Sequence, residues 1–253
     1  MRRTSLVYLL FFFSGISGLV YEIIWTRMLT LIFGHTVFSV SLVLSSFMAG
    51  LGLGAYFWGV TADQTEKLLL KYGKIEILIS IFSALISLSF ANFHPFYSWL
   101  HLWLPENHFV QNLFKGILAF SFMSIPTVLL GATLPIICKY CITDNKKLAN
   151  QVGFLYSLNS FGAAVGCIIT GYFLISALGV LQTALSASLV NLLIGIISIE
   201  IFYRENANEK ISLKLPKPLY PSLKWKKEDK VWIAVSFTCG FTALSYEVLW
   251  TRI

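Results

Sequence analysis

The sequence has few charged residues for its length, and this shortage excludes a water-soluble globular protein. Asp, Glu, Lys and Arg make up 12% of the 253 residues, about half of the roughly 25% that soluble domains carry. Hydrophobic residues make up 57%, and the mean hydropathy is +0.74. Long apolar runs with so little charge predict an all-α polytopic membrane protein whose main partner is the lipid bilayer.

Cysteine is also scarce, and we expect neither a metal site nor a cofactor site in these residues. Cys138 and Cys141 form a single CxxC pair, whereas a zinc site needs about four ligands. The sequence has no second pair and no histidine close to this one. The net charge of +7 does not indicate a nucleic-acid partner, because membrane proteins collect Lys and Arg in their cytoplasmic loops.

Six apolar stretches are each long enough to cross a bilayer as a helix, which takes about 20 residues. A seventh begins near Val231. The six predicted spans are Ser5–Phe33, Thr36–Ala62, Ile75–Asn92, Leu113–Ile137, Gly153–Ser176 and Gly179–Tyr203. We therefore divide the chain into a first six-helix membrane half (1–203), a cytoplasmic linker (204–230) and the first helix of a truncated second half (231–253).

The basic residues predict how the spans are oriented. Sixteen of the 19 Lys and Arg residues fall before the first span or in the second, fourth and sixth connections. Because Lys and Arg accumulate on the cytoplasmic side, we expect a cytoplasmic N-terminus in a bacterial inner membrane. The other three, Arg27, Lys115 and Arg252, lie near the opposite ends of their spans.

One segment of the first span occurs twice in the chain. Residues 12–28 and 237–253 are identical at eight of 17 positions, with a constant offset of 225 residues. The matching positions include Tyr21 and Tyr246, Glu22 and Glu247, Trp25 and Trp250, and Arg27 and Arg252. Two copies six spans apart must point in the same direction, as do the parallel halves of major facilitator proteins. We interpret the chain as a fragment, cut after the first helix of the second half.

This repeated segment holds the candidate binding site. Gly15, Gly18, Glu22 and Trp25 share one helical face, which small residues allow another helix to approach. A carboxylate inside a membrane is a functional candidate by default. Our hypothesis is a cation site in which two acids face an amine and aromatic rings supply π faces: Glu22, Tyr21, Trp25, Glu247, Tyr246 and Trp250. A structural bond between the halves and a proton relay remain alternatives.

Other motifs indicate helix packing. Gly50 and Gly54 form a GxxxG pattern within an apolar span, and Gly162 and Gly166 form another, so we expect close helix contacts there and no nucleotide loop. Two prolines within the fourth span, Pro126 and Pro135, predict a bent helix that either lines an interior or is simply kinked. The two motif arginines, Arg27 and Arg252, are expected to extend toward the outer surface.

Four blocks resemble one family, the bacterial membrane proteins that join a major-facilitator-like part to a spermidine-synthase-like part. The blocks are Ser14–Leu29, Phe33–Gly54, Pro126–Pro135 and Val152–Leu174. The resemblance implies a longer membrane portion and a soluble domain for polyamine biosynthesis. That domain would transfer an aminopropyl group from decarboxylated S-adenosylmethionine to putrescine. It would lie downstream, so no catalytic residue is assigned within these 253 residues.

We therefore expect the membrane domain of a fused spermidine-synthase-like protein, which binds or transports a polyamine or related cation. Two other functional interpretations stay open. One is a major-facilitator-type transporter without an enzyme domain, and the other is a structural membrane anchor.

Overall fold

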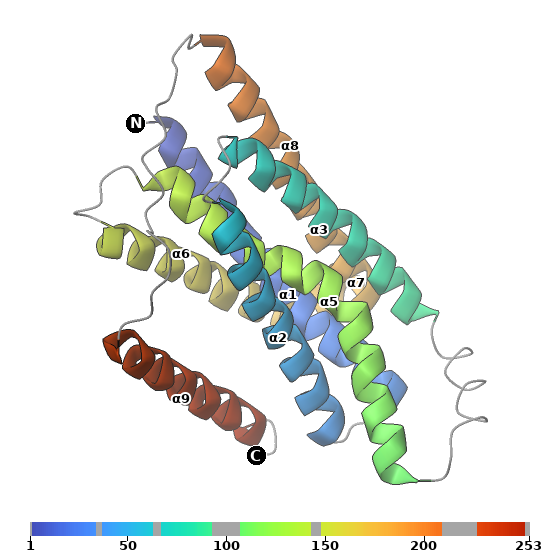
Figure 1. Ribbon diagram of the computed structural model, residues 1–253. Coiled ribbons are helices and arrows are strands. Elements are labelled where there is room, and N and C mark those ends of the chain that lie inside the picture. Colours follow the sequence, from blue (N-terminus) through green and yellow to red (C-terminus); the bar gives the residue numbers. More distant parts are fainter. Residues whose placement is uncertain are drawn as a thin grey trace.

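The structure is a computed structural model that describes residues 2–33, 37–62, 67–92, 107–142, 148–208 and 227–250. Every regular element in these ranges is helical (Figure 1). The elements are α1 (Arg2–Phe33), α2 (Val37–Ala62), α3 (Leu68–Ala91), α5 (His108–Cys141), α6 (Leu148–Ile169), η2 (Thr170–Leu174), α7 (Ile175–Leu178), α8 (Val180–Asn208) and α9 (Lys227–Trp250). Six of the helical stretches are long and apolar enough to cross a membrane. The predicted all-helical class is confirmed.

The third span begins earlier than the sequence predicts. Helix α3 starts at Leu68 instead of Ile75, so Lys71 and Lys74 lie in its first turns. Lys74 is exposed, and the Lys71 ammonium lies 4.8 Å from the centroid of the Trp58 ring on α2. A helix end tolerates these lysines because their long side chains carry the charge away from the apolar interior.

The fifth span is not one regular helix. A π-helical turn, η2, follows α6, and within it the Ile175 N–H donates to the Thr170 carbonyl. Helix α7 ends at Leu178, and the next residue, Gly179, has a φ of +81°, which favours glycine. This conformation lets α8 begin at the next residue. A π-helical turn leaves no recognisable pattern in the residue types, and such turns are frequent at functional sites.

The spans pair in an ordered way (Figure 1). Helix α1 packs against α6 and α8, α5 packs against α2 and α3, and α3 packs against α8. The pairs correspond when α1 is exchanged with α5, α2 with α6, and α3 with α8. The pair α1–α6 then becomes α5–α2, and the pair α1–α8 becomes α5–α3. The main helix pairs of the first three spans therefore correspond to those of the last three.

Glycines allow the closest of these approaches. A Cβ atom added to Gly162 on α6 would overlap the Phe12 carbonyl of α1, and one added to Gly54 on α2 would overlap the Val128 carbonyl of α5. Gly73 on α3 and Gly195 on α8 each face the other's backbone. The structure also places Gly15, Gly131 and Gly166 at backbone contacts of the same kind, and Gly50 against the Thr127 side chain of α5.

Helix α5 contains both predicted prolines and changes direction along its length (Figure 1). Each proline removes one backbone donor from the helix. Hydroxyl groups bond to carbonyls nearby: Thr127 donates to the Met123 carbonyl over 2.7 Å, and Thr133 donates to the Leu130 carbonyl over 2.7 Å. The helix is continuous through both positions.

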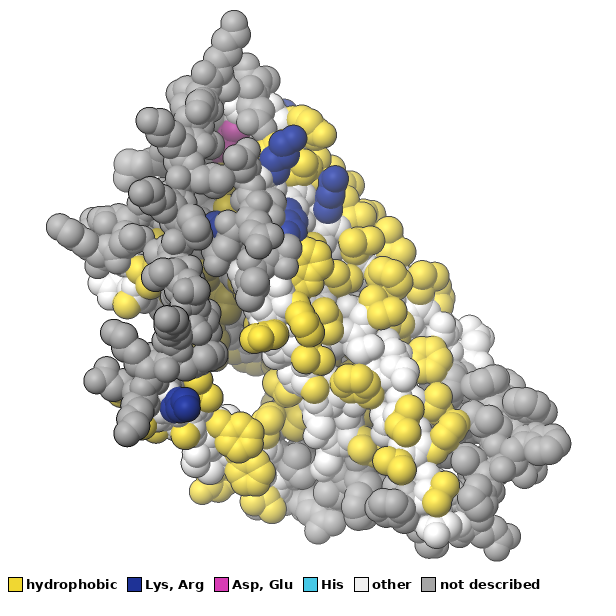
Figure 2. Space-filling view, viewed as in Figure 1, with side chains coloured by type: hydrophobic (Ala, Val, Ile, Leu, Met, Phe, Trp, Pro, Cys, Tyr) yellow, Lys and Arg dark blue, Asp and Glu magenta, His cyan; other side chains and the backbone are white. Residues whose placement is uncertain are grey.

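Apolar side chains dominate the described surface, whereas Lys and Arg gather toward one end (Figure 2). Charged residues near this end of the bundle include Lys67, Lys74 and Arg204. They come from the start of α3 and the end of α8, which lie side by side (Figure 1). This arrangement agrees with the sorting of basic residues by sequence. Which side of a membrane this end faces remains a prediction.

Helix α9 lies apart from the bundle (Figure 1) and contacts α2 only slightly. Its residues from Lys230 to Ala243 are exposed. Gly240 corresponds to Gly15 in the sequence repeat, yet a Cβ atom there would meet open space, whereas at Gly15 it would overlap Asn159 of α6. On α1 the face that contains Gly15 packs against α6, whereas the corresponding face of α9, which contains Gly240, has no neighbouring helix in the described structure.

Replacing Gly54 with leucine should destabilise the bundle by about 1–3 kcal/mol or more, because the side chain must separate α2 from α5. Gly52 is the matched control: it lies on the same helix, and a Cβ atom added there meets nothing within 4 Å. Both substitutions gain the same helix propensity, so their difference reports packing. Thermal unfolding and gel filtration in detergent would measure it. Equal stability of Gly54→Leu and Gly52→Leu would contradict the contact.

Candidate functional site

One face of α3 carries polar residues through the middle of the bundle. Tyr72, Glu76, Ser80, Ser83 and Ser87 follow one another at spacings of four, four, three and four, and all are buried. Such spacing places them on a single helical face. We call these five residues and their neighbours on α1 and α8 the polar seam; the neighbours are Ser14, Tyr21, Trp25, Ser188 and Asn191. The α3 part spans about 22 Å at 1.5 Å per residue.

Glu76 is the charged residue of the polar seam, and its side chain is 0% exposed. The Ser14 hydroxyl of α1 donates to its Oε1 over 2.7 Å, and the Asn191 amide of α8 donates to its Oε2 over 2.9 Å. The Tyr72 hydroxyl lies within interaction range of the same carboxyl group. No Lys, Arg or His of the described residues pairs with it. Glu76 therefore links three helices without a counter-ion in this part of the chain.

Several polar atoms of the seam have no hydrogen-bond partner of good geometry among the described residues. They are the hydroxyls of Tyr21, Tyr72 and Ser83 and the Asn191 Oδ1 atom. A buried polar group without a partner costs about 1–3 kcal/mol. In a native structure such groups require an explanation, and a bound species or a second conformation can supply one.

Two further contacts join helices along the seam. Ser188 of α8 donates to the Ser80 carbonyl over 2.6 Å, and the two hydroxyls are 3.0 Å apart. Because the Ser188 proton is used in the first bond, Ser80 donates in the second. Nearer the end of α3, the Trp25 indole N–H donates to the Ser87 hydroxyl over 3.0 Å. The seam thus holds α3 to α1 and α8 along most of its length.

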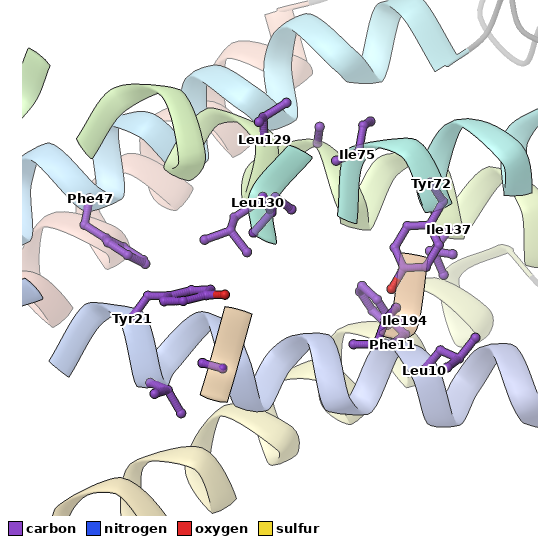
Figure 3. Packing of buried hydrophobic residues seen from close by; sticks show 14 of the residues in the cluster. Leu10, Phe11, Tyr21, Phe47, Tyr72, Ile75, Leu129, Leu130, Ile137 and Ile194 are labelled. Carbon is purple, nitrogen blue, oxygen red and sulfur yellow. The ribbon is translucent and has the colours of Figure 1, made fainter. Parts of the chain in front are cut away.

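Apolar side chains enclose the seam. Figure 3 shows Tyr21 and Tyr72 extending from α1 and α3 into the packed interior. Phe11 and Ile194 lie beside Tyr72 in this view, and both are buried members of the hydrophobic core. The polar groups therefore lie in a low-dielectric region, where hydrogen bonds are stronger and unmatched groups are costly.

The structure places the predicted residue Glu22 on α1 with 8% of its side chain exposed. Tyr21 and Trp25 are fully buried, and their rings stack on each other with centroids 5.1 Å apart. Trp25 also lies near Phe47 of α2. In this conformation the two rings contact protein, so an amine over their faces would require them to separate.

The second copy of the motif lies on α9. Tyr246 is 58% exposed, and the side chains of Glu247 and Trp250 lie outside the described residues, as does Arg252. Arg27 of the first copy is exposed. Tyr21 and Trp25 are therefore brought together, whereas Tyr246 lies on a helix apart from the bundle.

Sequence reasoning did not select Glu76. The signal that could have identified it is the helical spacing of Tyr72, Glu76, Ser80, Ser83 and Ser87. Glu76 and Ser14 lie at one level, and Glu22 lies eight residues, or about 12 Å, further along α1. The two acids therefore belong to separate levels of the bundle.

Two hollows on the described structure lie away from the seam. One, of about 340 Å³, lies between α2, α3 and α5 and includes Trp58, Phe82 and Leu129 in its lining. The other, of about 390 Å³, lies between α2 and α5 and is lined by residues such as Leu42 and Phe120. Their apolar linings suit lipid chains more than a charged ligand.

Known proteins similar to this chain are polyamine aminopropyltransferases. The chain is 22% identical over 211 residues to polyamine aminopropyltransferase 1 of Streptomyces coelicolor, which covers 83% of the chain and 36% of that protein. It is 23% identical over 215 residues to the polyamine aminopropyltransferase of Oceanobacillus iheyensis, which covers 81% of the chain and 37% of that protein. The chain thus spans just over a third of the length of these curated relatives. No protein-family model and no solved structure matches it.

Replacing Ser188 with alanine should lower the free energy of unfolding by about 1–3 kcal/mol, because the buried Ser80 hydroxyl loses its partner. Ser186 supplies the matched control on the same helix, since its hydroxyl bonds only to carbonyls of α8 itself. Ser186→Ala should change stability by no more than about 0.5 kcal/mol. Unfolding of both variants in detergent would measure the difference. Equal effects would count against a stabilising α3–α8 contact.

Proposed function

We propose that this chain is the membrane-embedded part of a protein related to the polyamine aminopropyltransferases. The observation that carries the proposal is the extent of the similarity, which covers 83% of the chain. A match of 211 residues is too long to arise from one or two apolar helices and takes in most of the six-helix bundle. The wider protein would transfer an aminopropyl group from decarboxylated S-adenosylmethionine in a domain outside these residues.

We propose further that the bundle is one half of a major-facilitator-type membrane unit. Each half of such proteins contains two sets of three helices related by an inverted repeat. The exchange symmetry of the helix pairs supports this reading, since α1 pairs with α6 as α5 pairs with α2. The repeated motif on α9 would then begin the second half, and a further helix would cover Gly240.

The membrane unit would bind a polyamine or related cation through Glu22. A carboxyl group that is 8% exposed on an apolar helix is costly to maintain, and residues of this kind usually face a bundle interior or a polar pathway. Polyamines carry several positive charges, so a membrane carboxylate offers them a matching contact. Glu247 would supply a second acid if the two halves close around the substrate.

Two alternatives make different predictions for the intact protein. A transporter without an enzyme domain would move amines but would transfer no aminopropyl group. A structural anchor would do neither, while a separated synthase domain would keep its activity. Amine uptake into proteoliposomes and aminopropyl transfer from decarboxylated S-adenosylmethionine, measured on the same preparation, would distinguish the three.

Replacing Glu22 with glutamine should weaken spermidine binding to the intact protein about tenfold or more, because a contact to a charged group contributes about 1.5–3 kcal/mol. Calorimetric titration in detergent would measure the affinity. Glu200→Gln is the control, because Glu200 is exposed and pairs with Arg204 on the same helix. Unchanged affinity of a folded Glu22→Gln variant would remove Glu22 from the site.

A further inference from the structure

We propose that Glu76 is a proton-binding site of the membrane unit, distinct from Glu22, at which one proton is taken up and released between α1, α3 and α8. The site lies about 12 Å from the start of α3, counted as eight residues from Leu68. The proposal depends on the local geometry alone and does not require that the chain binds a polyamine.

Glu76 needs a positively charged partner or a proton. Its side chain is 0% exposed, and in the described residues its neighbours are Ser14, Asn191 and Tyr72, all of them uncharged. Buried carboxyl groups are paired with a cation, coordinate a metal or become neutral. No Lys, Arg or His pairs with Glu76 in the described chain, so the cation must come from outside these residues.

The geometry favours a proton over a metal ion or an amine. Both carboxyl oxygens already accept hydrogen bonds, of 2.7 and 2.9 Å. Among the described residues no group of three or more His, Cys, Asp and Glu side chains could hold a metal. A proton needs no additional volume.

The groups around Glu76 can accommodate both protonation states. When Glu76 is charged, Ser14 and Asn191 donate to it, as the structure shows. When Glu76 carries a proton, a half-turn of the Asn191 amide brings Oδ1 into position to accept it. That oxygen has no partner in the described structure. A hydroxyl can also donate or accept, so Ser14 serves either state.

The other titratable groups near this site are few. Tyr21 faces the seam from α1, Tyr72 lies beside Glu76 on α3, and Cys141 of α5 lies in range of Tyr72. Helix α8 presents Asn191 and serines at this level, and its first described acid beyond them, Glu200, lies nine residues further toward the end. Glu76 is therefore the carboxyl group that pH would act on at this contact.

Labelling with the hydrophobic reagent dicyclohexylcarbodiimide, which reacts with protonated carboxyl groups in apolar surroundings, tests the site in the intact protein in detergent. Mass spectrometry of the peptide that contains Glu76 should show labelling that decreases as the pH is raised across the range in which the protein stays folded. Replacing sodium with choline at equal ionic strength should leave the labelling unchanged. No labelling, constant labelling across that range, or protection by sodium would each overturn the proposal.

Infrared difference spectra between low and high pH supply a second measurement. One component of the carboxylic C=O band that forms at low pH in the natural protein and in Glu22→Gln should be absent in Glu76→Gln, while the components of the other carboxyl groups stay. Persistence of that component in a folded Glu76→Gln variant would assign the proton elsewhere. The labelling experiment uses the natural protein, so it decides the question even if Glu76→Gln does not fold.

Discussion

The contact of helix backbones at glycine is the constraint on which the rest of this bundle depends. In a bilayer, lipid chains solvate apolar side chains as well as a neighbouring helix does, so association relies on close packing and on hydrogen bonds between helices. Gly162 brings α6 onto the Phe12 carbonyl of α1, and Gly54 brings α2 onto the Val128 carbonyl of α5. A side chain at either position would separate the pair. The same kind of glycine contact therefore occurs in both pairs, α1 with α6 and α2 with α5.

Close approach at Gly73 and Gly195 has a consequence for the polar seam. These glycines hold α3 and α8 near each other, and only at that distance can short side chains such as Ser80 and Ser188 bond across the gap. Asn191 reaches Glu76 under the same condition. The packing therefore makes the polar contacts possible, and the contacts in turn restrict how far the helices can slide. A change of charge at Glu76 would act directly on this three-helix contact.

Much of the fold could be predicted from the sequence, because length and hydropathy are enough to identify apolar helices. The early start of α3 was missed because Lys71 and Lys74 resemble loop residues until Trp58 is seen beside Lys71. The π-helical turn at Thr170–Leu174 is a backbone feature without a residue pattern. The motif around Glu22 stood out because it is repeated. Glu76 occurs once, and its importance depends on Ser14 and Asn191, which lie 62 and 115 residues away in sequence.

The relation between the two acids follows from their positions. Ser14 of α1 lies beside Glu76, and Glu22 follows Ser14 by eight residues, so about 12 Å separates the two acids along the helix axes. Between these two heights lie the hydroxyls of Tyr21, Ser83 and the Ser80–Ser188 pair. These intervening groups are hydroxyls, and each can donate and accept. Two of them, on Tyr21 and Ser83, have no partner of good geometry in the described structure. The level of Glu76 and the level of Glu22 are thus separated by hydroxyl groups of α1, α3 and α8, which can reorient without a new helix contact. If Glu22 binds a cation and Glu76 a proton, as proposed, the two sites share α1 and α3 and are separated by the hydroxyls of the polar seam.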